Sequence, residues 1–241
     1  MVKKSIVTLY VVASSSSLVI LAFSLTSLFS PNWSVCTAIR NATGAPDDVK
    51  DPPNDPFSGL VTFGVIYGHK QFNYGYGARD RQSFLVFQEY DGVFETSYVI
   101  VSLVFMVSTV IFAGVSLFFG VINAKMVPIE TIHGRPGLFL WNGIGLFSGL
   151  ISTSIFAVLY ANELKFECLS EADREDRFST HRAILGYSFW FLVVCDVLFL
   201  VNLLLVYITQ LIDEPPKFLK RRRTADINVE PPIELKDGIM Y

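Results

Sequence analysis

One carboxylic acid, Asp196, lies in the stretch 184–212, which otherwise contains no charged residue. An ionised side chain near the centre of a membrane-spanning helix costs roughly 2.5 to 3.5 kcal/mol on insertion scales, so Asp196 needs polar partners. Counting along the apolar stretches puts Ser24, Ser102 and the range 152–154 at its depth. Asp196 could belong to an ion or proton path, or it could clamp neighbouring helices. We favour the clamp, because transporters usually show several intramembrane polar groups, broken helices and repeats.

Other reactive side chains do not form a recognisable catalytic or metal site. The three histidines are scattered, and the three cysteines lack the spacing of zinc ligands. The sequence has no glycine-rich phosphate loop and no nucleophile elbow, so we expect neither an enzyme nor a cofactor. A net charge of −3 without a basic domain also argues against nucleic acid as a partner.

The composition indicates an integral membrane protein, because 51% of the residues are hydrophobic and only 17% are charged. Four stretches are long and apolar enough to cross a hydrocarbon core of about 30 Å as helices. They are 5–30, 96–122, 138–161 and 184–212. A cleavable signal peptide competes for the first stretch, but its apolar part is longer than such peptides usually have. We therefore predict an all-α membrane protein with a four-transmembrane-helix bundle.

Basic residues near the stretch ends give the orientation. Residues 1–4 include Lys3 and Lys4, and a dense cluster follows the last stretch: Lys217, Lys220, Arg221, Arg222 and Arg223. Such clusters stay on the cytoplasmic side, so both termini are expected there. The first and second extracellular loops are then 31–95 and 162–183, the cytoplasmic hinge is 123–137, and the tail 213–241 is expected to be disordered. The cluster could also bind anionic lipids.

The first extracellular loop predicts a small β-sheet. Residues 60–67 and 83–90 are rich in β-branched and aromatic side chains, and they flank the glycine-punctuated segment 68–81. We expect two antiparallel strands there. Because a lone hairpin is marginal in water, a third strand is expected near 33–39, or else packing on the helix ends.

Two kinds of covalent site fall in the extracellular loops. Cys36 and Cys168 lie one in each loop, on the oxidising side, and could bond to each other. Free thiols and an intermolecular bond remain open. Two glycosylation sequons begin at Asn32 and Asn41. We favour Asn41, because Asn32 lies almost at the membrane and has tryptophan in the middle of its sequon.

Two features suggest contacts with other molecules. Gly143, Gly145 and Gly149 let another helix approach closely, which favours packing within the chain and leaves a homo-oligomer open. At the C-terminus, Ile239 and Tyr241 occupy alternate positions before the free carboxylate. That pattern suits a PDZ domain, which adds such a tail as a strand. An unbound tail is the competing interpretation.

Five groups of residues, in this order, resemble the clarins, small four-span membrane proteins related in layout to the claudin and PMP22-type tetraspans. They are Pro31-Asn32-Trp33, Tyr74 to Arg79, Glu130 to Gly134 with Gly137 to Gly143, Gly186 to Trp190, and Asp237 to Tyr241. The resemblance implies a non-enzymatic plasma-membrane scaffold that contacts other membrane proteins and organises actin-linked complexes, in vertebrates chiefly in sensory cells for hearing and vision. A small ion or proton channel or transporter centred on Asp196 is the alternative.

The sequence departs from the claudin pattern in its first loop. Claudin first loops carry Gly-Leu-Trp and two cysteines, whereas here Trp33 is followed in the loop by Cys36 alone. The intraloop disulfide and the pore-lining function of claudins therefore do not transfer to this chain.

Overall fold

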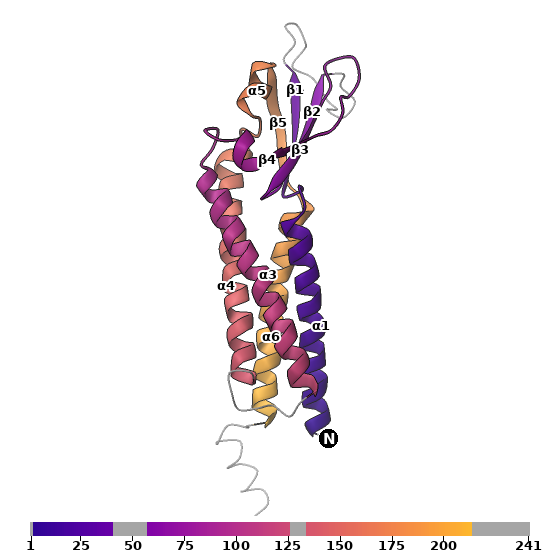
Figure 1. Cartoon of the computed structure of the whole chain (residues 1–241), viewed down its shortest axis with the longest axis vertical. Coiled ribbons are helices and arrows are strands. Elements are labelled where there is room, and N and C mark those ends of the chain that lie inside the picture. Colours follow the sequence, from indigo (N-terminus) through magenta and orange to yellow (C-terminus); the bar gives the residue numbers. More distant parts are fainter. Residues whose placement is uncertain (1, 41–56, 126–133, 214–241) are drawn as a thin grey trace, which may run out of the picture.

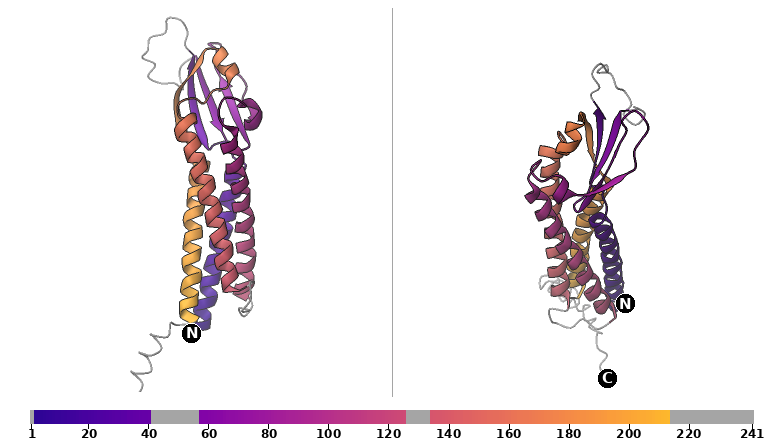
Figure 2. Two further views of the ribbon diagram at one scale, coloured as in Figure 1. Left: turned by 90° about the vertical axis from the view of Figure 1, so that its left-hand side faces the viewer. Right: turned by 45° about the horizontal axis from the view of Figure 1, so that its top comes forward.

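Four long helices run side by side, and one small sheet lies at the end of the bundle (Figure 1). The computed structural model describes residues 2–40, 57–125 and 134–213. The expected fold class, a four-span bundle with a small sheet, is confirmed. Figure 2 shows from two further directions that the sheet extends the long axis of the bundle.

The long helices are α1 (Val2–Leu28), α3 (Thr96–Lys125), α4 (Arg135–Leu159) and α6 (Tyr187–Asp213). Each is long and apolar enough to cross a membrane. α1 and α4 both pack against α3 and against α6, so the four helices form a ring in the order α1, α3, α4, α6. A π-helical turn, η2 (Tyr160–Leu164), prolongs α4 toward the sheet.

α4 begins three residues earlier than the sequence predicted. We expected Pro136 and its flanking glycines to end the hinge, but Arg135, Pro136 and Gly137 form the first helical turn after Gly134. Proline is tolerated there because the first backbone N–H groups of a helix have no intrahelical acceptor.

The sheet contains five antiparallel strands: β1 (Ser34–Arg40), β2 (Ser58–Phe63), β3 (Tyr67–Phe72), β4 (Gln82–Leu85) and β5 (Phe178–Leu185). Their spatial order is β4-β3-β2-β1-β5. β1 is the third strand that the sequence predicted. β5 comes from the charged second loop, where we expected no strand. Two short helices, α2 (Val86–Glu89) and α5 (Glu171–Glu175), accompany the sheet.

Both predicted strands of the first loop have wrong limits. The stretch 60–67 contains the end of β2, a turn and the start of β3. At Gly64 an added Cβ would lie 2.5 Å from the Tyr67 carbonyl oxygen and 2.7 Å from that of Ser30, so the turn requires glycine. The stretch 83–90 is extended only to Leu85 and then becomes α2.

Trp33 joins the sheet to the bundle. Its side chain is fully buried, and its Nε1 donates a hydrogen bond of 2.8 Å to the carbonyl oxygen of Ser27 in α1. The indole packs on Phe156 of α4 and Phe189 of α6, with ring centroids 4.7 and 6.4 Å away. The Trp33 backbone N–H donates to the oxygen of Phe63 in β2 at 2.8 Å. One residue therefore fixes three helices relative to the sheet.

Candidate functional site

Two groups of polar side chains stand out, one between the sheet and the short helices α2 and α5, and one inside the bundle. In the first group, Cys36 of β1 and Cys168, which precedes α5, form a disulfide with their Cα atoms 6.4 Å apart. Both cysteines are buried. Of the three states that the sequence left open, the structure contains the intramolecular bond, which links the two loops.

A capping box sets the start of α5 just after Cys168. The Ser170 hydroxyl donates to Asp173 Oδ2 at 2.7 Å and accepts from the Asp173 backbone N–H at 3.4 Å. The Ser170 backbone N–H donates back to the same carboxylate oxygen at 3.4 Å. This reciprocal pairing satisfies two N–H groups of the first turn and holds the Asp173 carboxylate in place.

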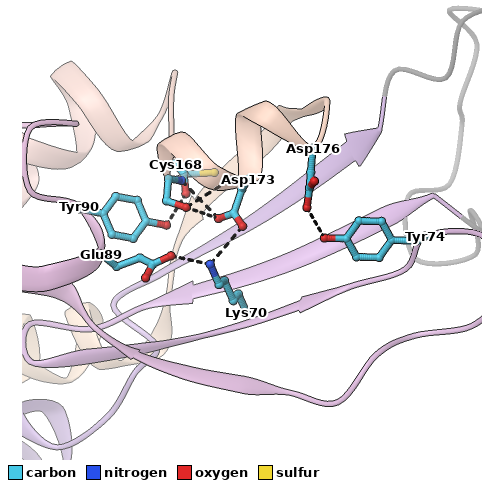
Figure 3. A network of polar contacts seen from close by, with 8 residues as sticks. Lys70, Tyr74, Glu89, Tyr90, Cys168, Asp173 and Asp176 are labelled. Carbon is cyan, nitrogen blue, oxygen red and sulfur yellow. Dashed lines mark hydrogen bonds and ion pairs between the residues drawn. The ribbon is translucent and has the colours of Figure 1, made fainter.

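Lys70 of β3 reaches from the sheet to both short helices (Figure 3). Its Nζ lies 2.5 Å from Glu89 Oε1 of α2 and 3.1 Å from Asp173 Oδ1 of α5. Burial by itself lowers the pKa of Lys70, but the hydrogen bond with Glu89 and the charge of Asp173 outweigh it, so the pKa is raised. The ammonium group thus stays charged and ties the two loops together beside the disulfide.

Two tyrosines complete this network (Figure 3). Tyr90, which is buried, donates from its hydroxyl to the Cys168 carbonyl oxygen at 2.9 Å. Tyr74 donates to Asp176 Oδ2 at 2.7 Å, and the Arg79 guanidinium carbon lies 4.1 Å from the centroid of its ring. Burial raises the pKa of both phenols, and the hydrogen bond to Asp176 adds to the rise at Tyr74. Both phenols therefore act as donors at neutral pH.

A recess of about 180 Å³ opens beside these residues. Lys70, Tyr74, Arg79, Asp80, Asp173 and Asp176 are among the residues that line it. Its charges are mixed, and the Lys70, Asp173 and Asp176 side chains already have partners. Within the described ranges, no group of three histidine, cysteine or acidic side chains could hold a metal ion. The network is suited to holding the two loops in one arrangement.

Inside the bundle, Asp196 of α6 is 6% exposed. The Thr153 hydroxyl of α4 donates to its Oδ2 at 3.0 Å, while Oδ1 has no hydrogen-bond partner among the described residues. Thr153 belongs to the range that we expected at this depth. The carboxylate lies on Gly149, where an added Cβ would clash with Oδ1.

A second polar layer lies further along α6. The Asn202 amide donates to Ser17 Oγ at 3.0 Å and to Asn142 Oδ1 at 3.3 Å, which links α6 to α1 and α4. Phe199, one turn from both layers on α6, is fully buried and packs on Gly145. Ile20 of α1 is also fully buried in this core. Apolar side chains thus separate the two polar layers.

α3 and α4 are joined by hydroxyl groups. Ser102 Oγ donates to the Ser152 carbonyl oxygen at 3.2 Å, and Ser152 Oγ donates to the Ser102 carbonyl oxygen at 2.9 Å. Ser108 Oγ and Ser148 Oγ lie 3.2 Å apart. Ser102 was expected at the depth of Asp196, but its partner is Ser152 and not the carboxylate.

The remaining predicted residues have diverse positions. Gly145 and Gly149 are packing positions within the chain, whereas an added Cβ at Gly143 would meet nothing within 4 Å. Asn32 Nδ2 donates to the Tyr187 hydroxyl at 2.9 Å. Outside the described residues lie the Asn41 sequon, the basic cluster (Lys217, Lys220, Arg221, Arg222, Arg223) and the terminal pair (Ile239, Tyr241).

The sequence did not predict the contacts of Asn142, Asn202 and Lys70. The two asparagines interrupt apolar stretches in the same way as Asp196, so the same signal could have identified them. Lys70 and its partner Asp173 carry no such signal, because they are charged residues of charged loops.

Known proteins resemble this chain over most of its length. The family model described as Clarin-2-like matches residues 2–206. Clarin-1 of Rattus norvegicus is 25% identical over 210 residues, which cover 85% of this chain and 87% of that protein. Clarin-2 of Mus musculus is 28% identical over 204 residues, with coverages of 82% and 83%. Clarin-3 of Homo sapiens is 25% identical over 189 residues, with coverages of 76% and 78%.

Proposed function

Because the chain belongs to the clarin family, we propose that it is a non-enzymatic scaffold or adaptor that organises plasma-membrane and actin-linked complexes. Family membership and the four apolar helices make it a multi-pass membrane protein. The proposal adds a cellular role, with sensory cells as the setting. It also adds an orientation, in which both termini are cytoplasmic and the sheet is extracellular.

The observation that carries the proposal is the filled core between the two polar layers. Ions and protons cross a membrane protein along polar groups or water, and an apolar constriction lets them pass only when it opens and becomes wet. Here Phe199 lies between Asp196 and Asn202 along α6, and it is fully buried together with Ile20. This arrangement supports a clamp between helices and argues against the channel or transporter.

The loop network supports the scaffold in a second way. A protein that binds partners gains affinity when its binding surface is already in the bound shape, because less conformational entropy is lost. The disulfide, the Lys70 ion pairs and Trp33 hold the sheet to the short helices and to the bundle. The disulfide also supports the proposed orientation, because such bonds persist in oxidising compartments.

The proposed cytoplasmic contacts lie outside the described residues. We assign the basic cluster from Lys217 to Arg223 to anionic lipids of the inner leaflet. We assign Ile239 and Tyr241 to a PDZ domain, whose groove would hold the terminal carboxylate. A homo-oligomer and contacts with other membrane proteins belong to the same proposal.

The first experiment separates the scaffold from the channel. The full-length protein is reconstituted into liposomes, and ion and proton flux are measured across a pH series with the wild type and with Asp196→Asn. We expect no flux from either protein, together with normal folding and surface delivery of the variant in cells. A pH-dependent current that Asp196→Asn abolishes would overturn the scaffold in favour of the channel.

The second experiment tests recruitment. Proximity labelling from the C-terminal tail in cells should recover actin-linked and PDZ-containing proteins. Appending one alanine after Tyr241 moves the carboxylate and shifts the strand register, so the PDZ proteins should be lost while surface delivery stays normal. An unchanged set of labelled proteins would contradict the PDZ assignment, and a set without actin-linked proteins would contradict the scaffold.

A further inference from the structure

The two sides of the sheet differ in chemistry. Strand register places Arg182, Thr37, Leu60 and Gln71 in one row across β5, β1, β2 and β3. The next row on the same side is Ile184, Val35, Thr62, His69 and Ser83. We call the side formed by these two rows the open face. The row between them contains Cys36 and Lys70, whose side chains point to the opposite side of the sheet because successive residues of a strand alternate. Cys36 bonds to Cys168 just before α5, and Lys70 pairs with α2 and α5, so we call this side the covered face.

The open face is apolar and cationic. Leu60 and Ile184 are 43% and 46% exposed, which is high for aliphatic side chains of a sheet. Arg182 is exposed at one edge, and Arg81 lies toward the other, where its guanidinium donates to Thr62 Oγ1 at 3.5 Å. Burial and the Arg81 charge lower the pKa of His69, so this histidine is neutral at physiological pH. The described part of the two rows contains no carboxylate.

The covered face carries α5, which has an excess of acidic side chains; we call its exposed surface the acidic side. α5 contains Glu171, Asp173 and Glu175 against a single basic residue, Arg174. Arg174 is already paired with Glu167 at 2.6 Å, and Asp173 with Lys70. Glu171 and Glu175 are exposed and have no ion pair among the described residues. This side therefore offers free carboxylates to a neighbour.

The strands run close to the long axis of the molecule, and α5 lies beside the sheet (Figure 1). The two faces of the sheet are therefore roughly parallel to the long axis of the bundle. In a membrane that the helices cross, each face is turned toward neighbouring proteins and not toward the lipid surface. The open face and the acidic side belong to opposite sides of one sheet, so two copies with parallel helices can bring the open face of one against the acidic side of the other. Such a contact uses different surfaces on the two copies and leaves one of each unoccupied, so it can repeat.

We propose that the open face binds the acidic α5 side of a second copy of this chain in the same membrane, and that Arg81 and Arg182 of one copy meet Glu171 and Glu175 of the next. Leu60 and Ile184 supply the apolar contact. Membrane anchoring raises the effective concentration of the copies, so a modest contact between small patches is sufficient. This contact rests on the homo-oligomer of the proposed function and gives it a defined interface. The flux and labelling experiments test the scaffold separately, because they do not report contacts between copies.

The test is cross-linking between two tagged full-length copies in cell membranes. One copy carries Leu60→Cys on the open face and the other carries Ala172→Cys on α5, an exposed position. The native thiols do not interfere, because Cys36 and Cys168 are bonded and Cys195 is buried. A short bifunctional maleimide should give the mixed dimer, whereas two Leu60→Cys copies should give little. Absence of the mixed dimer, or a dominant Leu60-to-Leu60 product, would overturn the proposal.

Charge exchange makes the test specific. Arg81→Glu with Arg182→Glu in the first copy should lower the mixed cross-link about tenfold, a factor that corresponds to about 1.4 kcal/mol. Glu171→Arg with Glu175→Arg in the second copy should restore it. Lys165→Glu in the first copy is the matched control, since it reverses an exposed charge outside the open face and should change nothing. Retention of the Cys36–Cys168 bond shows that each variant is folded. Equal cross-linking by the arginine variants and the wild type would contradict the contact.

Discussion

Asp196 of α6 lies directly on Gly149 of α4, and the missing side chain of Gly149 is what makes room for the carboxylate. Thr153, one turn further along α4, donates the hydrogen bond of 3.0 Å that holds Oδ2. Gly149 and Thr153, at positions i and i+4 of α4, therefore provide the space and the hydrogen bond for the Asp196 side chain. Gly145 provides the space for Phe199 one turn away.

A side chain added at Gly149 should destabilise the bundle. We expect Gly149→Ala to lower stability by about 1 to 3 kcal/mol, because the new methyl group must displace a well-packed carboxylate. The measurement is the thermal unfolding midpoint of the purified protein in detergent. Gly143→Ala is the matched control, since its added Cβ would meet nothing within 4 Å. Equal midpoints for the two variants would show that Asp196 is not seated on Gly149.

Removing the hydroxyl partner of Asp196 should also destabilise the bundle. Thr153→Val keeps the shape of the side chain but leaves both Asp196 oxygens without a hydrogen bond from the described residues. We expect a loss of about 1 to 3 kcal/mol in the same thermal assay. In the background of Asp196→Ala the same substitution should cost less, because no side-chain oxygen is left to accept the Thr153 hydrogen bond. An identical cost in both backgrounds would contradict the clamp.

The Lys70 ion pairs should make the loop domain sensitive to high pH. The pKa of Lys70 in the folded protein is raised above its ordinary value of 10.5. Its contribution to stability is therefore fully present below about pH 10.5 and is lost as the pH rises through the folded-state pKa. We therefore expect the thermal unfolding midpoint of the wild type to decrease as the pH rises above about 10.5.

Lys70→Met tests this assignment, because it keeps a long apolar stem and removes the charge. The variant should lose about 2 kcal/mol at neutral pH, a value between those of exposed and fully buried pairs, and should show a shallower fall above pH 10.5. Lys165→Met, at an exposed position, is the control. A fall above pH 10.5 of the same size in Lys70→Met and in the wild type would assign the effect to other groups.

The sequence predicted the bundle well because each long helix can be recognised from its own residues. A run of uncharged residues long enough to span a bilayer is visible without any knowledge of its neighbours, and all four runs became helices. Positions such as Pro136 were less predictable, since proline both ends helices and begins them.

The sheet was only partly predictable, because its pairing depends on residues far apart in the chain. β5 pairs with β1 across the two loops, and its sequence of Ser179, Thr180, His181 and Arg182 carries no clear apolar alternation. The turn at Gly64 is concealed by apolar residues on both sides, which made 60–67 resemble one strand. The contact of Lys70 with Asp173 forms only after the sheet and α5 are in place.

Loss of the disulfide should impair the loop domain more than the bundle. The two cysteines are 132 residues apart, and closing a loop of that length stabilises a protein by about 5 kcal/mol in the chain-entropy model. We expect Cys36→Ser to abolish the mobility difference between reduced and non-reduced gels and to lower surface delivery severalfold. Cys168→Ser and the double variant should match it, whereas Cys195→Ala should not alter the gel mobility. Normal surface delivery of the double variant would show that the bond is dispensable.

Glycosylation offers the most direct test of which side the sheet faces. Asn32 lies four residues after the end of α1, its side-chain amide donates to the Tyr187 hydroxyl, and the next residue, Trp33, is fully buried. β1 ends at Arg40, at its end farther from the bundle (Figure 1), and Asn41 is the next residue in the sequence. We expect endoglycosidase to shift the band of the wild type from secretory-competent cells, and we expect Asn41→Gln to remove most of that shift. Asn32→Gln serves as the comparison and should leave the shift intact, because a site so close to the membrane is poorly accessible to the glycosylating enzyme. An unshifted wild-type band would count against use of either sequon, and a shift that depends on Asn32 and not on Asn41 would reverse the assignment.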